Sequence, residues 1–120
     1  MEQAVLNKIL DEHKEWLRTN GEKGKRANLR SADLRYADLR SADLSSANLG
    51  FSAFPLWCGG LDVHIDDKQA TQLLYHLIRN VKYSKNTSAT MKKLCRLKSL
   101  VKQANKFHRV NECGMVGDDK

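Results

Sequence analysis

The 120-residue chain has few of the features from which catalytic and metal sites are usually built. Its three cysteines, Cys58, Cys95 and Cys113, include no Cys-x2-Cys pair, and an odd number does not suit a disulfide framework. No phosphate-binding loop, nucleotide fingerprint or paired-carboxylate motif is present. A thiol nucleophile at Cys58, with His64 or His76 as its base, is the alternative that the spacing leaves open. We predict no enzymatic activity, no metal, no cofactor and a reducing, cytoplasmic location.

Long apolar runs are also missing. No stretch approaches the roughly 20 residues that a membrane-spanning helix needs. The N-terminus lacks a basic region followed by an apolar stretch and a small-residue cleavage site, so we expect no secretory signal. A chain of this length supports one compact domain, whose core lies near the lower limit of independent stability.

Acidic residues are absent from residues 82–109, which hold nine lysines and arginines. Such a segment suits contact with phosphates or with an acidic protein surface, although a solvated helix face is the simpler interpretation. It has few Arg, Asn or Gln side chains to recognise base edges, so sequence-specific DNA contact is not indicated. The predicted contact residues are Lys92, Arg96, Lys98, Lys102, Lys106 and Arg109.

A five-residue repeat fills residues 27–51, where five units in phase read Ala-(Asp/Asn)-Leu-x-x, and a degraded sixth unit ends at Leu56. A period of five suits neither a helix nor a flat strand. It predicts a three-residue extended piece and a two-residue corner, with Ala and Leu pointing inward and Asp or Asn pointing outward. Stacked coils of this kind bury one another, as in solenoid proteins.

These units resemble the pentapeptide-repeat family. The resemblance implies a right-handed, four-sided parallel β-helix with about twenty residues in each coil. The six units would then make about one and a half coils. We therefore expect an α+β fold in which this short β-helix lies between helical segments.

The flanking segments complete the predicted organisation. Residues 1–26 are expected to form a capping helix, with Trp16 and Leu17 over the open first coil. Residues 27–66 would hold the β-helix and a final strand. Residues 67–120 would form a helical hairpin, with helices over about 67–83 and 88–109, within one compact domain.

The resemblance also favours a non-enzymatic protein-interaction role. Some members of the family mimic DNA and bind gyrase, but here Asp33 and Asp38 are balanced by Arg35 and Arg40, so DNA mimicry is not expected. The predicted function is inhibition of a host nucleic-acid-handling protein, such as a CRISPR effector or a topoisomerase, by a phage or mobile-element protein. The alternatives are a nucleic-acid binder and a purely structural module.

Two further predictions concern surfaces. Tyr and Arg are enriched at binding hot spots, so the outward residues of the repeat are second candidates for partner contact. They are Arg30, Arg35, Tyr36 and Arg40. A homodimer through the C-terminal helices is predicted, because Leu100 and Phe107 lie off the main apolar stripe of the second helix.

Overall fold

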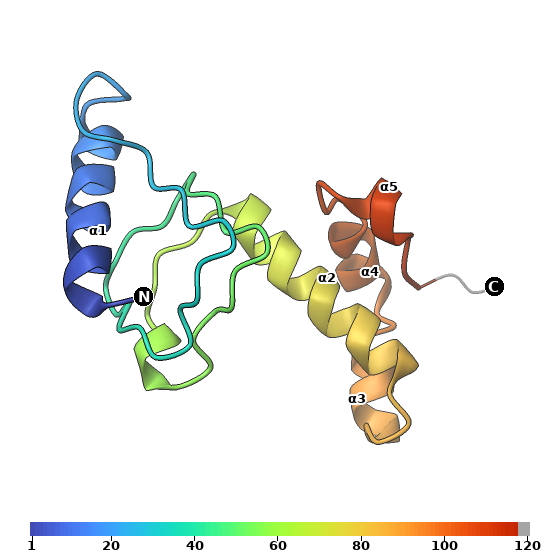
Figure 1. The fold of residues 1–120 in the computed structure, drawn as a ribbon. Helices are drawn as coiled ribbons and strands as arrows, with labels where there is room; N and C mark the ends of the chain where they lie inside the picture. The colour runs from blue at the N-terminus through green and yellow to red at the C-terminus, as the bar shows by residue number, and fades with distance from the viewer. Residues whose placement is uncertain (118–120) are drawn as a thin grey trace. The chain divides into compact units, whose positions relative to one another are not determined.

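The computed structural model describes residues 1–117 and divides the chain into two compact units, with the boundary between Asp66 and Asp67 (Figure 1). The first unit contains helix α1 (Gln3–Arg18), a turn-rich coil and the short 3-10 helix η1 (Cys58–Gly60). The second unit contains α2 (Asp67–Tyr83), α3 (Ala89–Leu94), α4 (Lys98–Ala104) and α5 (Val110–Cys113). No helix among the described residues is long and apolar enough to cross a membrane.

Each repeat unit of the coil consists of a short extended side and a hydrogen-bonded turn. Within one unit the Asp33 carboxylate accepts the N–H of Arg35 at 3.2 Å, and the N–H of Ala37 donates to the Leu34 carbonyl at 3.0 Å. Asn28, Asp38, Asp43 and Asn48 each accept the backbone N–H two residues later in the same way. The Asp or Asn at the second position therefore stabilises the turn that follows it, because a short acceptor side chain reaches that N–H.

Successive coils are joined by backbone hydrogen bonds between residues about twenty positions apart. The N–H of Leu29 donates to the Asn48 carbonyl at 2.9 Å, and the N–H of Ala53 donates to the Ala32 carbonyl at 2.9 Å. The register changes near η1, because Asn28 pairs with Asn48 but Asp43 pairs with His64, one residue further on. The extra residue lies between Ala53 and Gly59, because the Leu34 N–H donates to the Ala53 carbonyl whereas the Leu39 N–H donates to the Gly59 carbonyl, one position further on.

The predicted α+β fold with a parallel β-helix and a final strand is wrong. The described residues contain no β-strand or sheet, and the contacts between coils are three isolated parallel bridges, Asn28–Asn48, Asp33–Ala53 and Asp43–His64. The reason lies in the repeat, because a turn follows every two or three extended residues. Each extended piece therefore meets the neighbouring coil at no more than one bridge, and no ladder of consecutive bridges forms within residues 1–117.

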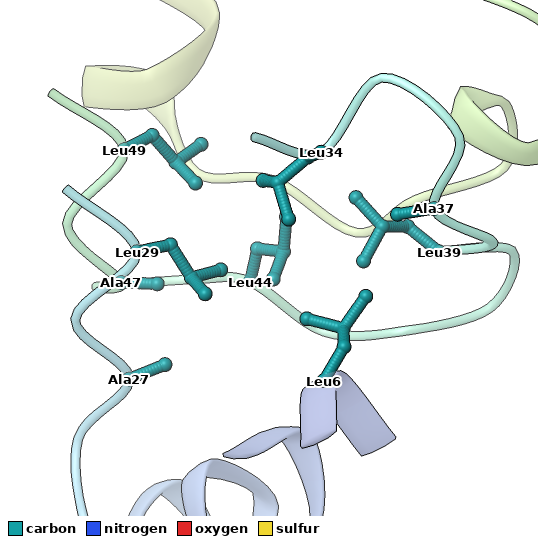
Figure 2. Packing of buried hydrophobic residues seen from close by; sticks show 9 residues of the cluster. All are labelled: Leu6, Ala27, Leu29, Leu34, Ala37, Leu39, Leu44, Ala47 and Leu49. Carbon is teal, nitrogen blue, oxygen red and sulfur yellow. The ribbon is translucent and has the colours of Figure 1, made fainter. Parts of the chain in front are cut away.

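The core of the first unit is made by the leucines of the repeat. Leu29, Leu34, Leu39 and Leu44 are fully buried and Leu49 is nearly so, as the repeat pattern predicted. They gather with the small residues Ala27, Ala37 and Ala47 (Figure 2). Burying one such leucine contributes about 1.5–3 kcal/mol, so this short ladder supplies most of the unit's apolar stabilisation.

Helix α1 covers the open edge of the first coil, but not with the residues that the sequence predicted. Leu6 and His13 are its fully buried residues, whereas Trp16 lies partly exposed and stacks on the His13 ring. The His13 ring joins two open backbone groups: the N–H of Ala27 donates to Nδ1 at 3.0 Å, and Nε2 lies 2.8 Å from the Ser45 carbonyl. The helix thus replaces hydrogen bonds that a preceding coil would make.

The second unit packs its short helices on α2. Tyr75, Ile78 and Val81 form the buried face of α2, and Phe107 stacks on Tyr75 with a centroid distance of 4.6 Å. The predicted long helix over 88–109 is wrong, although Ser88 does cap its start by accepting the Met91 N–H. That segment is instead divided into α3 and α4, with turns at residues 95–97 and 105–109.

Burial of apolar residues explains the division. The break lets Cys95, Ala104 and Phe107 all reach one apolar cluster with α2, which a straight helix of that length would not allow. Burial therefore prevails over a moderate helix propensity.

Candidate interaction surface

The fourth and fifth residues of most repeat units lie exposed at the turns, and some of these turns carry large apolar side chains. Tyr36 lies at such a turn and is 85% exposed. Leu56, twenty residues later, is 97% exposed. The Asp33–Ala53 bridge joins the segments that precede Tyr36 and Leu56, so the two side chains lie on neighbouring coils.

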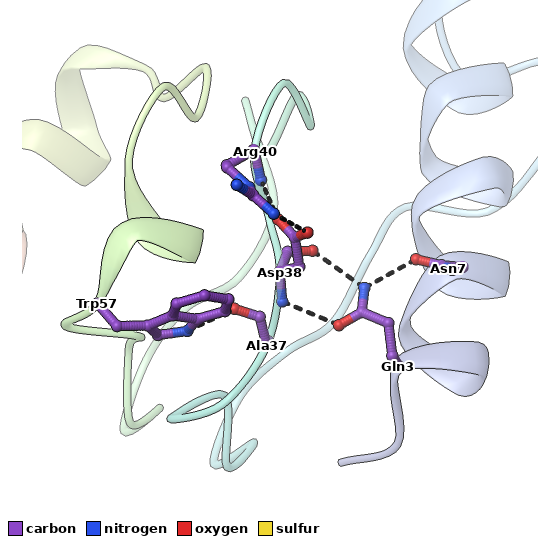
Figure 3. Close-up of polar contacts among 6 residues, drawn as sticks. All are labelled: Gln3, Asn7, Ala37, Asp38, Arg40 and Trp57. Atoms are coloured by element: carbon purple, nitrogen blue, oxygen red, sulfur yellow. Dashed lines mark hydrogen bonds and ion pairs between the residues drawn. The ribbon is translucent and has the colours of Figure 1, made fainter.

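Trp57 extends this surface along the next side of the coil. Its indole N–H donates to the Ala37 carbonyl at 3.0 Å, which fixes the ring against the first coil (Figure 3). The guanidinium of Arg40 lies 5.9 Å from the centre of the Trp57 ring. The ring is half exposed, so it presents an apolar face that is already held in one orientation.

Two arginines flank the aromatic residues and are held by the carboxylates two positions before them. Arg35 contacts both oxygens of Asp33 at 2.8 Å, and Arg40 contacts those of Asp38 at 2.9 and 2.7 Å. The predicted local charge cancellation is confirmed by these pairs. Each guanidinium is therefore preorganised, and little side-chain entropy remains to be lost on binding.

The same contacts set the acidity of the two carboxyl groups. The hydrogen bonds from the Arg35 side chain, and then from its backbone N–H, hold the pKa of Asp33 well below its usual range. Arg40 lowers the pKa of Asp38 to about 2 through the corresponding bonds. Both carboxylates therefore stay ionised throughout the physiological pH range.

We call these residues the Tyr36 face. They are Arg35, Tyr36, Arg40, Leu56 and Trp57. Arg30, the remaining candidate from the repeat, lies at a different turn, where its guanidinium is 4.6 Å from the ring centre of Phe51. The structure thus separates the four predicted repeat residues into one group of three and one outlier.

The cations predicted on the second unit do not form a single stripe. Lys92 is used structurally, because its ammonium donates to the Val81 and Ser84 carbonyls at 2.8 and 2.6 Å. Arg109 pairs with Glu112 at 2.8 Å. Lys98 and Lys102 share one face of α4, whereas Lys106 follows the end of that helix and Arg96 precedes its start. Lys98, Lys102 and Lys106 are exposed.

The residues considered for chemistry are not brought together. Among the described residues no group of three or more His, Cys, Asp or Glu side chains is placed to hold a metal ion. Cys58 and Cys113 are exposed and Cys95 is buried. His64 is fixed in the coil by its pairing with Asp43, while His76 belongs to the second unit.

Comparison with known protein families gives one match in this chain. The family model described as pentapeptide repeats (8 copies) matches residues 25–54. Residues 25–54 are therefore a pentapeptide-repeat segment. The matched segment contains the buried leucine ladder and three of the five residues of the Tyr36 face. Comparisons with curated proteins and with solved structures give no match.

Sequence reasoning missed Leu56 and Trp57, which lie just beyond the matched pentapeptide repeats. The sequence contained one signal for Leu56, because it is an apolar residue twenty positions after Tyr36, which is the spacing of one coil. Nothing in the local sequence indicates that the Trp57 indole bonds to Ala37, since that contact depends on the stacking of two coils.

Proposed function

We propose that this protein is a non-enzymatic binding protein that contacts a protein partner through the Tyr36 face. Pentapeptide repeats generally mediate protein–protein interaction. The observation that carries the proposal is the exposure of Tyr36 and Leu56 on neighbouring coils, with the fixed ring of Trp57 directly after Leu56 in the chain. Exposed apolar groups gathered in one place mark interaction sites, and Tyr, Trp and Arg dominate binding hot spots.

The expected partner surface is an apolar groove rather than an acidic patch. Arg35 and Arg40 are already neutralised by Asp33 and Asp38, so they offer little net charge to a partner. They keep donor N–H groups that hydrogen bond to carbonyl oxygens at the rim of a groove. Binding through this face is therefore expected to depend weakly on salt.

A comparison of matched variants tests the proposal. Quantitative affinity capture from a host lysate uses the wild-type chain, the Tyr36→Ala/Leu56→Ala variant and the Arg30→Gln variant, which changes a different turn. The expected partner is retained by wild type and by Arg30→Gln and is lost by the double alanine variant. With that partner purified, the double variant should bind at least tenfold more weakly, or about 1.4 kcal/mol. Equal binding by all three chains would refute a role for this face.

A second candidate function is nucleic-acid binding by the second unit. It is favoured by the exposed ammonium groups of Lys98, Lys102 and Lys106, for which no ion pair is found within residues 1–117. Reversing all three to Glu should then abolish binding to DNA or RNA, with a steep salt dependence in the unmodified chain. Loss of partner binding in this triple variant, with the double alanine variant unaffected, would select the cationic surface over the Tyr36 face.

The narrower form of the proposal concerns the identity of the partner. We propose a host protein that handles nucleic acid, a CRISPR effector or a topoisomerase, inhibited by a phage or mobile-element protein. Its support is the resemblance to family members that bind gyrase. Supercoiling and target-cleavage assays with the purified chain test it, and full enzyme activity at micromolar concentrations of the chain would contradict it.

The homodimer was predicted because Leu100 and Phe107 were expected to lie outside the core of the second unit, and the structure places both against that core. Phe107 is buried against Tyr75, and Leu100 packs on the same cluster, so neither residue remains available for a second copy. The dimer stays a prediction, which light scattering at high micromolar concentration tests.

A further inference from the structure

The second unit contains a cavity of about 280 Å³ at the C-terminal half of α2. Its apolar walls come from Ile78 and Val81, both almost fully buried, and from the thiol of Cys95 at the end of α3. These residues belong to the apolar cluster of the unit, so the cavity opens directly onto that core. The proposed protein-binding face uses none of them.

Gly117 forms another wall through a close backbone approach. Its φ is +79°, and a Cβ atom built there would lie 2.3 Å from a methyl carbon of Val101. A residue with a side chain would have to move the backbone away from Val101. The chain therefore passes tightly over this side of the cavity, and glycine is the residue that permits it.

Three cationic side chains line the same cavity, and none of its described lining residues is acidic. The Lys92 ammonium is held in place by the Val81 and Ser84 carbonyls at the end of α2. Lys82 extends beside the Tyr83 ring, at 5.6 Å from its centre. No ion pair found in the described part of the chain includes Arg96, so its charge has no acidic partner there.

We propose that this cavity binds a small amphipathic anion, an unbranched apolar chain that ends in one carboxylate. The apolar walls would take the chain, and Lys82 and Arg96 would meet the carboxylate, which Lys92 also attracts from its fixed position. At roughly 30 Å³ for each water-sized group, the volume suits on the order of nine non-hydrogen atoms. The cavity lies near the lower end of the 300–1,000 Å³ that is usual for small-molecule pockets, so longer lipids do not fit.

Octanoate is a suitable probe because its ten non-hydrogen atoms are close to the number that the cavity volume suits, and octanol is its neutral counterpart. Calorimetric titration of the full chain should show saturable binding of one octanoate, at least tenfold tighter than octanol. The Lys82→Gln/Arg96→Gln variant should lose this preference and bind the two probes alike. Lys93→Gln is the matched control, because Lys93 lies on α3 outside the cavity and its loss should leave octanoate affinity unchanged. Equal binding of both probes by the wild type, or no saturation, would overturn the proposal.

A second measurement locates the bound probe. In a Cys58→Ser/Cys113→Ser background the remaining thiol, Cys95, lines the cavity. Saturating octanoate should slow the reaction of Cys95 with a thiol reagent at least fivefold, while the Lys82→Gln/Arg96→Gln variant shows no such protection. Unchanged Cys95 reactivity with octanoate bound would place the anion elsewhere and would also refute the proposed site. Circular dichroism confirms that each variant keeps its helix content.

Discussion

The side-chain amide of Gln3 pairs with the peptide groups of Asp38 as a neighbouring strand would. Its Nε2 donates to the Asp38 carbonyl at 3.0 Å, and its Oε1 accepts the Asp38 N–H at 2.9 Å (Figure 3). One residue of α1 therefore satisfies both open groups of Asp38 on the edge of the first coil. An unpaired edge of this kind is a site for unwanted pairing with another chain, so the cap has a protective role as well as a stabilising one.

We first predict that Gln3→Leu destabilises the protein by about 1–3 kcal/mol, because both groups of Asp38 lose their partner. The stability of Gln3→Glu should lie between those of Gln3→Leu and the wild type, because a carboxylate accepts the Asp38 N–H but cannot donate to the Asp38 carbonyl. Urea unfolding, monitored by circular dichroism, measures the stability of both variants. Asn7→Ala is the control, because it removes the hydrogen bond that the same amide nitrogen makes within α1 and leaves both bonds to Asp38. Equal stability of Gln3→Leu and Asn7→Ala would contradict this role.

The second prediction concerns His13, which is fully buried. Because Nδ1 accepts the Ala27 N–H, the ring must carry its proton on Nε2, which donates to Ser45. His13→Phe should cost roughly 2–5 kcal/mol, since it leaves both backbone groups without a partner inside the protein. Nitrogen-15 NMR should detect the Nε2–H tautomer in the wild type. An Nδ1–H tautomer, or a His13→Phe variant as stable as the exposed control Lys14→Gln, would disprove the assignment.

The third prediction is acid sensitivity of the repeat. Arg35 and Arg40 lower the pKa values of Asp33 and Asp38 in the folded state. An Asp whose pKa is lower in the folded state than in the unfolded state stabilises the protein at pH values above its unfolded pKa of about 3.9. This stabilisation is lost as the pH falls through the folded-state pKa. The urea midpoint should therefore fall steadily from about pH 4 downward.

The control for this effect is Asp33→Asn/Asp38→Asn. Asparagine still accepts the turn N–H, as Asn28 and Asn48 do in other units, but it forms no ion pair. The double variant should lose less stability than the wild type between pH 4 and pH 2. If both proteins show the same acid dependence, the two ion pairs do not contribute to stability.

The fourth prediction separates the core from the surface of the same repeat. Leu39 is fully buried, so Leu39→Ala should cost about 2–5 kcal/mol, the usual range for a buried leucine. Leu56 is almost fully exposed, so Leu56→Ala should change stability by less than about 0.5 kcal/mol. Chemical denaturation measures both. A large loss in Leu56→Ala would show that Leu56 packs against the fold, and the Tyr36 face would then be incorrect.

Much of the first unit was determined by the sequence alone. The Ala-(Asp/Asn)-Leu units predicted the buried leucines, because the direction of a side chain within a short extended piece depends only on its immediate neighbours. The helices α1 and α2 were also predicted closely, since each has an apolar face whose residues recur at helical spacing in its own sequence. The same repeat predicted that Arg35, Tyr36 and Arg40 point outward, and all three are exposed.

Tertiary structure decided how these pieces meet. Gln3 and His13 became capping residues, in place of Trp16 and Leu17, because only the stacked coil shows which backbone groups remain open. The β-helix was replaced by isolated bridges because turns interrupt every extended piece before a ladder can form. The long helix was divided because burial of Cys95 and Phe107 on α2 outweighs the continuity that local propensity favours. Local sequence patterns determine the conformation of a segment and which of its side chains point inward. The hydrogen-bond partner of each polar group depends on contacts between residues far apart in the chain.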